Sequence, residues 1–583
     1  MTAANTMLVL LAALVLLSGA CGTPSEVEKR YASGVELYEA GEYIEAISEF
    51  DEVVRLEPDR LTGYLRRGIA YVDSLQSMKA LPDFDEAIRL DPLLPIARML
   101  RGIAFVRLNE FDNAVAEFDK ADRLSAISEQ SSLADDPDVV KLRTLAYKLR
   151  GEAFVELGRL QRAVEDLDEA IRLSPKDVAI HMSRAKAYSG MGDMTQALED
   201  HSEAIRLAPH DATGYVERGM TYGAMDQFET AVEDFDEAIR IDPELGLAYL
   251  RRANAHNVLG RASKALSDYD AAIRLDPGMA EAYTNRGLAR LSRGDYLRAI
   301  EDFDEAIRLD HRFPAPFINR GSAYARIGET ELAIEDYDEA IRLDLSTMAT
   351  SGSPEEYDFS GSVRAYKMRG HAYGDLGQLE RAVQDFEEAI SLSPRDAEAY
   401  SSRGITYGKL GEFERAIEDH DQAINIDAGL TISYLNRGFA YGNLGEFQRA
   451  VQDFDEAVRL DADLALPYIK QGLPFESLDD LRQVAAQVEA YDEAIRRSPD
   501  DPVAYYNRGN LYAAVGELAR AIADYDSAIC LDPEAGPVYA RRALALTLIG
   551  DDEAASKDLD RAVEFGVDRA MLESDVESTK LQR

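Results

Sequence analysis

The residues that could carry out chemistry are few and scattered. The chain has 583 residues, with seven histidines and two cysteines, Cys21 and Cys530. The sequence contains no phosphate-binding glycine loop, nucleophile elbow, zinc-type pairing of Cys or His, or His-Glu helix motif. His201, His256 and His420 stand where related segments have an aromatic residue, so we expect them in the core. The sequence therefore predicts no catalytic residue, no metal site and no cofactor, and we expect a protein that is not an enzyme.

Carboxylates are abundant, but their arrangement does not suit acid-base catalysis. Stretches such as EDFDEAI recur along the whole chain, which is too regular for one catalytic pair. With 108 acidic against 64 basic residues, the formal net charge is -44. Binding to nucleic acid needs clustered Lys and Arg, so we expect no nucleic-acid partner. Self-repulsion of this charge favours a soluble monomer.

The strongest signal in the sequence is a repeat with a spacing of 34 residues. A small residue that usually follows Arg is the landmark of each repeat. Around Gly219, for example, Tyr222 lies three residues after the landmark, Ala231 twelve after and Phe235 sixteen after. The fifteen landmarks, which number the repeats below, are Gly34, Gly68, Gly102, Gly151, Ala185, Gly219, Ala253, Gly287, Gly321, Gly370, Gly404, Gly438, Gly472, Gly509 and Ala543.

Each repeat is predicted to form a helical hairpin. Small residues at the landmark and twelve residues later let two helices approach closely. Gly, Asn or Asp seven residues after the landmark is typical of a helix that ends in a left-handed residue. The second helix has apolar residues on one side and carboxylates on the other. Because one hairpin cannot bury its apolar faces alone, the repeats must stack on one another.

The order of aromatic, small, aromatic, Ala, aromatic, Ala and Pro resembles the tetratricopeptide repeat, with Tyr or Phe in place of the usual Trp. This resemblance implies an all-α fold, a right-handed superhelical solenoid of about fifteen stacked hairpins. It also implies partner proteins bound along a concave face that is lined by the first helices. Residues six and three before the landmark, and one, four and five after it, would lie on that face.

The residues at these offsets have a nearly neutral total charge and include several asparagines. Such a face is suited to binding an extended peptide or a helix. We take the following residues as candidate partner contacts: Lys148, Lys186, Asn254, Asn257, Arg326, Lys367, Lys409, Asn443 and Asn510. A complete set of Lys and Asn for a partner's free C-terminus is not found. The sequence does not identify the partner.

Arg precedes the landmark in thirteen repeats, where the family usually has Leu, and the same repeats have an acid fifteen residues after the landmark. We predict a bidentate, partly buried ion pair between the two helices of each hairpin, because the planar fork of Arg fits a carboxylate. The named pairs are Arg67 with Asp83, Arg218 with Asp234, Arg286 with Asp302, Arg437 with Asp453 and Arg508 with Asp524.

The N-terminal residues are predicted to direct export. The apolar run Leu8 to Leu17 suits a signal peptide, and the small residues before Cys21 resemble the lipobox of bacterial lipoproteins. That resemblance implies cleavage before Cys21 and a diacyl anchor on it, although the segment could instead remain as an uncleaved anchor. We expect a membrane-anchored protein of the cell envelope.

The spacing of the repeats is interrupted at three places. It is 49 after Gly102 and Gly321, and 37 after Gly472. Pro82 and Pro474 fall inside or near helices and should make their repeats irregular. The predicted divisions are 1-20 signal peptide, 21-25 spacer, 26-124 repeats 1-3, 125-140 insert, 141-344 repeats 4-9, 345-360 insert, 361-565 repeats 10-15 with repeat 13 irregular, and 566-583 C-terminal cap.

These patterns favour a scaffold that binds peptide or helical segments of other proteins in a concave groove. The inserts either bind a ligand or are remnants of the duplication of a six-repeat block. The alternative function is an acidic spacer, or a surface protein that buffers divalent cations without a specific protein partner. That alternative predicts calcium-dependent stability.

Overall fold

The computed structural model describes residues 25–128, 137–351, 360–472 and 477–582. These described residues form 31 helices and no strand. They divide into two compact units on either side of the bond between Ala289 and Arg290, and each unit is described by itself. The predicted signal peptide and Cys21 lie outside the described residues.

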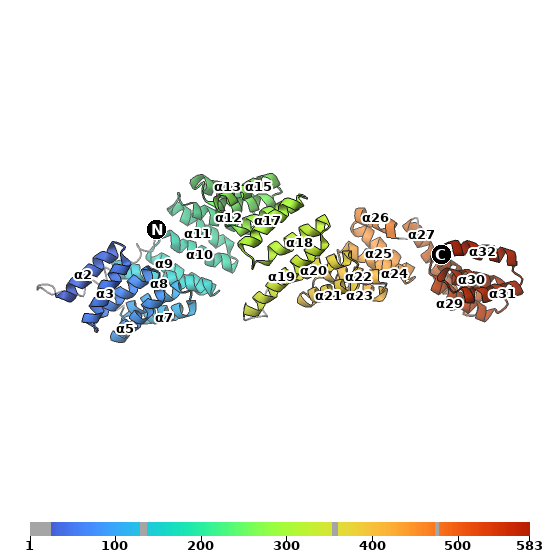
Figure 1. Cartoon of the computed structure of the whole chain (residues 1–583), viewed down its shortest axis with the longest axis horizontal. Coiled ribbons are helices and arrows are strands. Elements are labelled where there is room, and N and C mark those ends of the chain that lie inside the picture. The colour runs from blue at the N-terminus through green and yellow to red at the C-terminus, as the bar shows by residue number, and fades with distance from the viewer. Residues whose placement is uncertain (1–24, 129–136, 352–359, 473–476, 583) are drawn as a thin grey trace. The chain divides into compact units, whose positions relative to one another are not determined.

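The helices of the first compact unit are consecutive pairs (Figure 1). Their bounds are α2 Glu26–Glu39, α3 Tyr43–Leu56, α4 Leu61–Asp73, α5 Ser77–Leu90, α6 Pro95–Arg107, α7 Phe111–Ser128, α8 Pro137–Glu156, α9 Leu160–Leu173, α10 Val178–Met191, α11 Met194–Leu207, α12 Ala212–Ala224, α13 Phe228–Ile241, α14 Gly246–Val258 and α15 Ala262–Leu275. Helix α16, Ala280–Leu291, begins in this unit and ends in the next.

The second compact unit continues the same pattern. Its helices are α17 Tyr296–Leu309, α18 Pro314–Ile327, α19 Thr330–Ser351, α20 Ser360–Asp375, α21 Leu379–Leu392, α22 Ala397–Leu410, α23 Phe413–Ile426, α24 Thr431–Asn443, α25 Phe447–Leu460, α26 Ala462–Gly472, α27 Leu478–Arg497, α28 Pro502–Ala514, α29 Leu518–Leu531, α30 Gly536–Ile549, α31 Asp552–Glu564 and α32 Arg569–Gln582.

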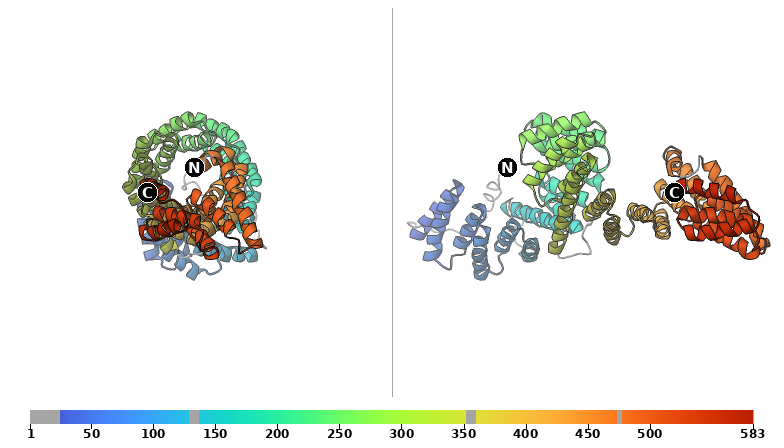
Figure 2. Two further views of the ribbon diagram at one scale, coloured as in Figure 1. Left: turned by 90° about the vertical axis from the view of Figure 1, so that its right-hand side faces the viewer. Right: turned by 45° about the vertical axis from the view of Figure 1, so that its right-hand side comes forward.

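Within each unit the two helices of a repeat pack on each other, except in repeat 13, and the second helix packs on the first helix of the next repeat. The pairs remain side by side when the molecule is turned (Figure 2). The all-α fold of stacked helical hairpins that the sequence predicts is therefore confirmed.

The first helix of a repeat ends where the sequence predicts a left-handed residue. Gly41 and Gly192 have φ angles of 82° and 80° at this place, and Asn109 and Asp226 adopt 59° and 58°. Leu75 occupies the same place in repeat 2 with a φ of 61° and a side chain that is 84% exposed. A branched residue is strained in this region, so Leu75 is the least favourable of these turn residues.

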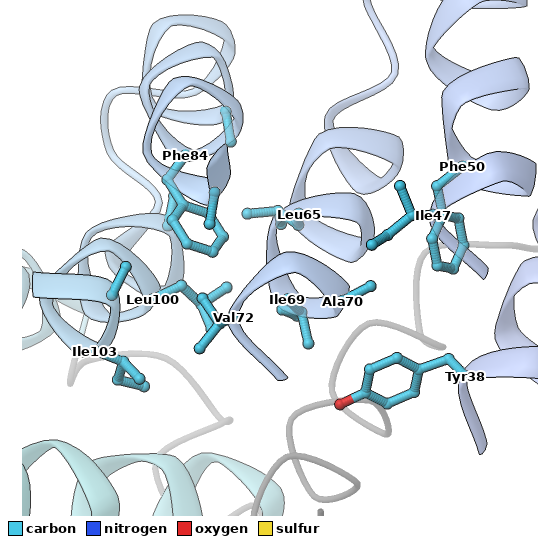
Figure 3. Packing of buried hydrophobic residues seen from close by; sticks show 14 of the residues in the cluster. Tyr38, Ile47, Phe50, Leu65, Ile69, Ala70, Val72, Phe84, Leu100 and Ile103 are labelled. Carbon is cyan, nitrogen blue, oxygen red and sulfur yellow. The ribbon is translucent and has the colours of Figure 1, made fainter. Parts of the chain in front are cut away.

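The core of each hairpin depends on the landmark. A methyl group added to Gly68 would lie 2.6 Å from the ring of Phe84, so glycine is needed for the ring to pack there. Ala46, Ala80 and Ala114, twelve residues after their landmarks, are fully buried. Figure 3 shows how Phe84, Leu65 and Leu100 fill the space between neighbouring hairpins of repeats 1 to 3. Contact between neighbours thus supplies the core that a single hairpin lacks.

Both large inserts lengthen helices in their described parts. Helix α7 has 18 residues and α8 has 20, whereas the helices of most repeats have 13 or 14. Helix α19 continues for 22 residues. Residues 129–136 and 352–359, in the middle of the inserts, lie outside the described chain.

The prediction that Pro82 makes its repeat irregular is wrong, because α5 continues through it from Ser77 to Leu90. Repeat 13 does depart from the pattern. Helix α26 has 11 residues, and α27 has 20 and begins at Leu478. Residues 473–476, which include Pro474, are outside the described chain.

The C-terminal segment forms helix α32, which follows the last hairpin. Leu572 of α32 is buried against Ala540 and Ala562. Arg569 also pairs with Asp560 at 3.0 Å. This helix therefore covers the apolar end of repeat 15, and its polar residues face solvent.

Candidate functional site

Arg before the landmark forms a bidentate ion pair with the acid of the second helix in the same repeat. In Arg67, Nε donates to Asp83 at 2.9 Å and Nη2 at 2.5 Å. The acid is almost completely buried, whereas the arginine is partly exposed. The same geometry is found in Arg150–Asp166, Arg184–Asp200, Arg218–Asp234, Arg252–Asp268, Arg320–Asp336, Arg369–Asp385, Arg403–Asp419, Arg437–Asp453, Arg508–Asp524 and Arg542–Asp558.

The third nitrogen of the same guanidinium reaches the preceding repeat. Nη1 of Arg252 donates to Asp236 at 2.5 Å, and Asp236 lies two residues after the acid of its own repeat. Equivalent contacts are Asp51–Arg67, Asp119–Arg150, Asp168–Arg184, Asp270–Arg286, Asp304–Arg320, Asp338–Arg369, Asp421–Arg437, Asp492–Arg508 and Asp526–Arg542. We call this series of contacts the Arg–Asp ladder. It connects successive repeats, a role that the sequence analysis did not predict.

Four positions of the Arg–Asp ladder differ. Arg101 contacts Glu117 through Nη2 at 2.6 Å, while its Nε has no partner among the described residues. Arg218 meets Ser202 Oγ at 3.3 Å, and Glu387 stands in the repeat before Arg403, where other repeats offer an aspartate. Beside the boundary between the two units, Arg286 contacts Asp270 at 2.6 Å and Asp302 contacts Arg290 at 2.9 Å, and the pairing of Arg286 with Asp302 stays a prediction. The hydrogen bonds that Arg67 donates to Asp83 raise the pKa of the Arg67 guanidinium above its usual value, against the lowering effect of burial. The guanidinium therefore stays charged, and its function is structural.

The two candidate lysines three residues before the landmark are not free on the surface. Lys367 has a side chain that is 12% exposed and pairs with Asp396 at 2.9 Å and with Glu398 at 2.5 Å. Lys148 lies 4.0 Å from Glu152. Other residues at this offset, such as Leu65 and Val216, are buried. The offset therefore does not lie on the surface of the first helices in this chain.

Asn254 and Asn510 form hydrogen bonds inside their own hairpins. Asn254 Oδ1 accepts from the hydroxyl of Tyr269 at 2.7 Å, and Asn510 Oδ1 accepts from the hydroxyl of Tyr525 at 2.9 Å. Most other repeats have Phe at this core position. The amides therefore satisfy buried hydroxyl groups that Phe lacks, which the pairing of Asn with Tyr in the sequence could have indicated.

The remaining candidates lie at the surface. Lys186 is exposed, pairs with Glu156 at 2.8 Å, and lines a groove of about 410 Å³ with Val106 and Val155. Asn443 is exposed and donates to its own backbone at Phe439. Three more are exposed and have no hydrogen-bond or ion-pair partner among the described residues, namely Asn257, Arg326 and Lys409.

A further residue of the first helices was missed. Glu217 lies two residues before the landmark of repeat 6, is half-buried and forms no ion pair within the described chain. Burial raises the pKa of its carboxyl group, against the attraction of Arg251 and Lys186. Because burial removes part of the water around this carboxylate, a cationic partner would stabilise its charged form.

Three of the histidines, His181, His201 and His420, are buried parts of the fold. His181 Nδ1 contacts Asp200 at 3.1 Å, and its Nε2 contacts the carbonyl of Pro175 at 3.2 Å, so neither ring nitrogen remains for a substrate. Burial lowers the pKa of His201 to about 4 and that of His420 to about 3. Cys530 is exposed. In the described ranges, no three His, Cys, Asp or Glu side chains converge as metal ligands.

Each compact unit is a stack of helical hairpins with a shared core and regular turns. Family models described as tetratricopeptide repeat match residues 65–127, 216–280, 280–313, 316–347, 397–429, 432–464 and 502–534, and one described as TPR repeat matches 151–192 and 370–411. The chain therefore belongs to the tetratricopeptide-repeat family. Repeats of this family are generally non-catalytic modules for protein interaction.

Individual relatives match short parts of the chain. It is 30% identical over 101 residues to the small glutamine-rich tetratricopeptide repeat-containing protein 2 of Mycosarcoma maydis, and 41% identical over 78 residues to human tetratricopeptide repeat protein 36. These matches cover 17% and 13% of this chain, and 29% and 41% of the length of those relatives.

Solved structures resemble the chain at low identity. Yeast Tom70 is 15% identical with a TM-score of 0.36, and the match covers 75% of this chain and 98% of Tom70. YrrB, a TPR protein with an unusual peptide-binding site, is 24% identical with a TM-score of 0.28, and the match covers 35% of this chain and 96% of YrrB. Separately, no helix within the described residues is both long and apolar enough to cross a bilayer.

Proposed function

We propose that this protein is a non-enzymatic scaffold that binds peptide or helical segments of partner proteins on the face of its first helices. Family membership supports interaction with proteins. The proposal rests on one difference among the charged groups: some are paired with other residues of the chain, and others are not. The Arg–Asp ladder and Lys367 are occupied internally, whereas Arg326 and Lys409 are exposed and unpaired within the described chain. Groups that keep their solvation in the free protein are available to a partner.

Reversing both free charges, by Arg326→Glu with Lys409→Glu, is expected to reduce the captured partner about tenfold. Tagged full-length protein would be used to capture polypeptides, which are then quantified by mass spectrometry. The matched control is Lys557→Glu, because Lys557 is 73% exposed on a second helix. A bound polypeptide that both variants retain equally would argue against this face. A melting temperature that depends on calcium, with no polypeptide captured, would favour the acidic spacer.

We also propose that the protein is anchored to the cell envelope through a lipid on Cys21. The residues before Cys21 support this by their resemblance to a lipobox, and two acyl chains suffice for a stable anchor. Cys21→Ser is expected to move the protein from the membrane fraction to the soluble fraction and to abolish incorporation of a labelled fatty acid. Cys530→Ser serves as the control and should leave both unchanged. Unaltered membrane association of Cys21→Ser would instead indicate an uncleaved anchor.

A further inference from the structure

Repeat 13 lacks the ion pair that joins the two helices of the other hairpins. Gln471 replaces the arginine before the landmark, and Ala490 stands where the sequence of α27 aligns with Asp453 of α25. Asp455, which would meet the missing arginine, contacts Arg482 instead. Helix α26 packs on α24 and α25, whereas α27 packs on α25 and α28. Among the described residues, repeat 13 thus lacks the extended contact between its own two helices.

The exposure of side chains on α27 also reflects the missing contact between α26 and α27. Gln487 and Ala490 are exposed, whereas the residues aligned with them in repeat 12, Ala450 and Asp453, are buried. On the opposite side, Val488 of α27 is buried in one core with Phe447 of repeat 12 and Tyr512 of repeat 14. The rings of Phe447 and Tyr512 are 6.4 Å apart. The start of α25 in repeat 12 and the end of α28 in repeat 14 therefore lie next to each other, although repeat 13 separates them in the sequence.

A groove of about 680 Å³ lies between these elements. Phe447, Val488, Ile495 and Tyr512 give it apolar walls, and four arginines reach it. Three of them have carboxylate partners: Arg449 with Glu446 at 2.8 Å, Arg496 with Glu493 at 2.9 Å, and Arg508 with Asp492 at 2.5 Å. This volume is within the range of grooves that hold a few residues of a peptide or a small ligand.

Arg520 is the arginine of the groove without a carboxylate partner in the described chain. Its guanidinium lies 5.6 Å from the ring centroid of Tyr512 and against Gly445, where a side chain would collide with it. Glu517, the residue just before the helix of Arg520, is half-buried, and burial raises the pKa of that carboxyl group. The planar faces of this guanidinium are therefore packed, while its hydrogen-bond donors remain for a carboxylate.

We propose that this groove is a second docking site, which binds an extended acidic segment of a partner protein. One carboxylate of the segment pairs with Arg520, and a neighbouring apolar side chain packs on Phe447 and Tyr512. Charge complementarity within the groove selects this occupant, because four arginines line it against the carboxylates of Glu446, Glu489 and Asp492, and Arg520 is the arginine without a carboxylate partner in the described chain. The proposal rests on the scaffold function but uses a different surface from the face of the first helices.

The test measures fluorescence anisotropy of the full chain with a fluorescein-labelled peptide in which Asp and Glu alternate with Phe and Leu. A second peptide has Lys in place of each acid. The acidic peptide is expected to bind, and Arg520→Glu to weaken it about tenfold, because a charge-assisted hydrogen bond becomes a repulsion. Arg520→Gln removes the charge without repelling Glu517 and should give a smaller loss. Arg162→Glu is the matched control, because Arg162 occupies the same place in repeat 4, at 5.8 Å from the ring of Phe154.

Equal binding of the lysine peptide and the acidic peptide would overturn the proposal. An unchanged affinity of Arg520→Glu or Arg520→Gln for the acidic peptide, with unchanged melting temperatures, would also overturn it. If Lys409→Glu abolishes binding and Arg520→Glu does not, the peptide binds the face of the first helices. The scaffold function then stands and the second site falls. Dimerisation in sedimentation that Arg520→Glu removes would show that another copy of the chain is the occupant, which also overturns it.

Discussion

Arg252→Leu is expected to lower the free energy of unfolding around repeat 7 by about 3–5 kcal/mol, because it leaves a buried carboxylate without its partner. Arg252 donates to Asp268 at 2.8 and 2.6 Å and to Asp236 at 2.5 Å. Asp268 is buried, whereas Asp236 is 56% exposed. Most of the loss therefore arises in the hairpin of repeat 7, and a smaller part from the contact with repeat 6.

The measurement is native-state hydrogen exchange of α14 and α15, together with thermal melting, because a long repeat array need not unfold in one step. Arg240→Leu is the matched control: Arg240 is 64% exposed and pairs with Glu237 on the same helix, so hydrogen exchange and melting temperature should stay close to those of the wild type. Asp236→Asn should cost less than about 1 kcal/mol. Arg252→Leu combined with Asp268→Leu should recover much of the loss, since no charge is stranded. Equal effects of Arg252→Leu and Arg240→Leu would contradict a structural role for the Arg–Asp ladder.

His420→Phe is expected to stabilise repeat 11 by about 1–3 kcal/mol at pH 7, the cost of a buried polar group without a hydrogen bond. His420 is fully buried, and neither of its ring nitrogens has a hydrogen-bond partner among the protein atoms. Its ring packs on Gly404 as the ring of Phe454 packs on Gly438. Phenylalanine therefore fits this site and removes the unsatisfied group.

The same substitution should make the protein less sensitive to acid. Burial, aided by Arg437, lowers the pKa of His420 to about 3 in the folded state, from 6.5 in the unfolded state. Below pH 6.5 the unfolded chain binds a proton that the folded chain excludes, so stability falls as the pH decreases toward 3. At pH 4.5 the wild type should have lost about 2–3 kcal/mol that His420→Phe retains.

Melting temperatures and hydrogen exchange of α22 and α23 between pH 7.5 and 4.5 would measure this difference. His201→Phe is a parallel variant, because burial lowers the pKa of His201 to about 4. Carboxylates titrate in the same range, but they are shared by wild type and variant and cancel in the comparison. If wild type and His420→Phe lose stability in parallel, then His420 is already hydrated or protonated in the folded protein.

The Arg–Asp ladder explains why the repeats tolerate charge inside their hairpins. Each guanidinium binds one acid of its own repeat and, in most repeats, one of the preceding repeat, so a single side chain contributes to both the hairpin and the stack. Arg218, which meets Ser202 instead, is a natural variant of this design within the same chain. Coupling between repeats 5 and 6 is therefore expected to be weaker than between repeats 6 and 7.

The hairpins, their turns and the ion pair within most of the repeats could be predicted from the amino-acid sequence alone. These follow from contacts within one repeat, such as Gly68 with Phe84 or Arg67 with Asp83, and such contacts recur at fixed spacing. Repetition makes them visible, because fifteen copies of one pattern separate the required residues from the variable ones.

Contacts between repeats, and the exposure of single side chains, became visible only in the folded structure. Asp236 and Asp268 are both acids of a second helix, but only the packing shows that Arg252 binds both of them. Lys367 and Lys409 are both lysines on first helices, yet one is enclosed by Asp396 and Glu398 while the other is exposed. The physical reason is that pairing and solvation depend on how neighbouring repeats pack. Asp236 and Arg252, and likewise Lys367 and Glu398, belong to different repeats, and the pattern within one repeat does not encode the distance between them.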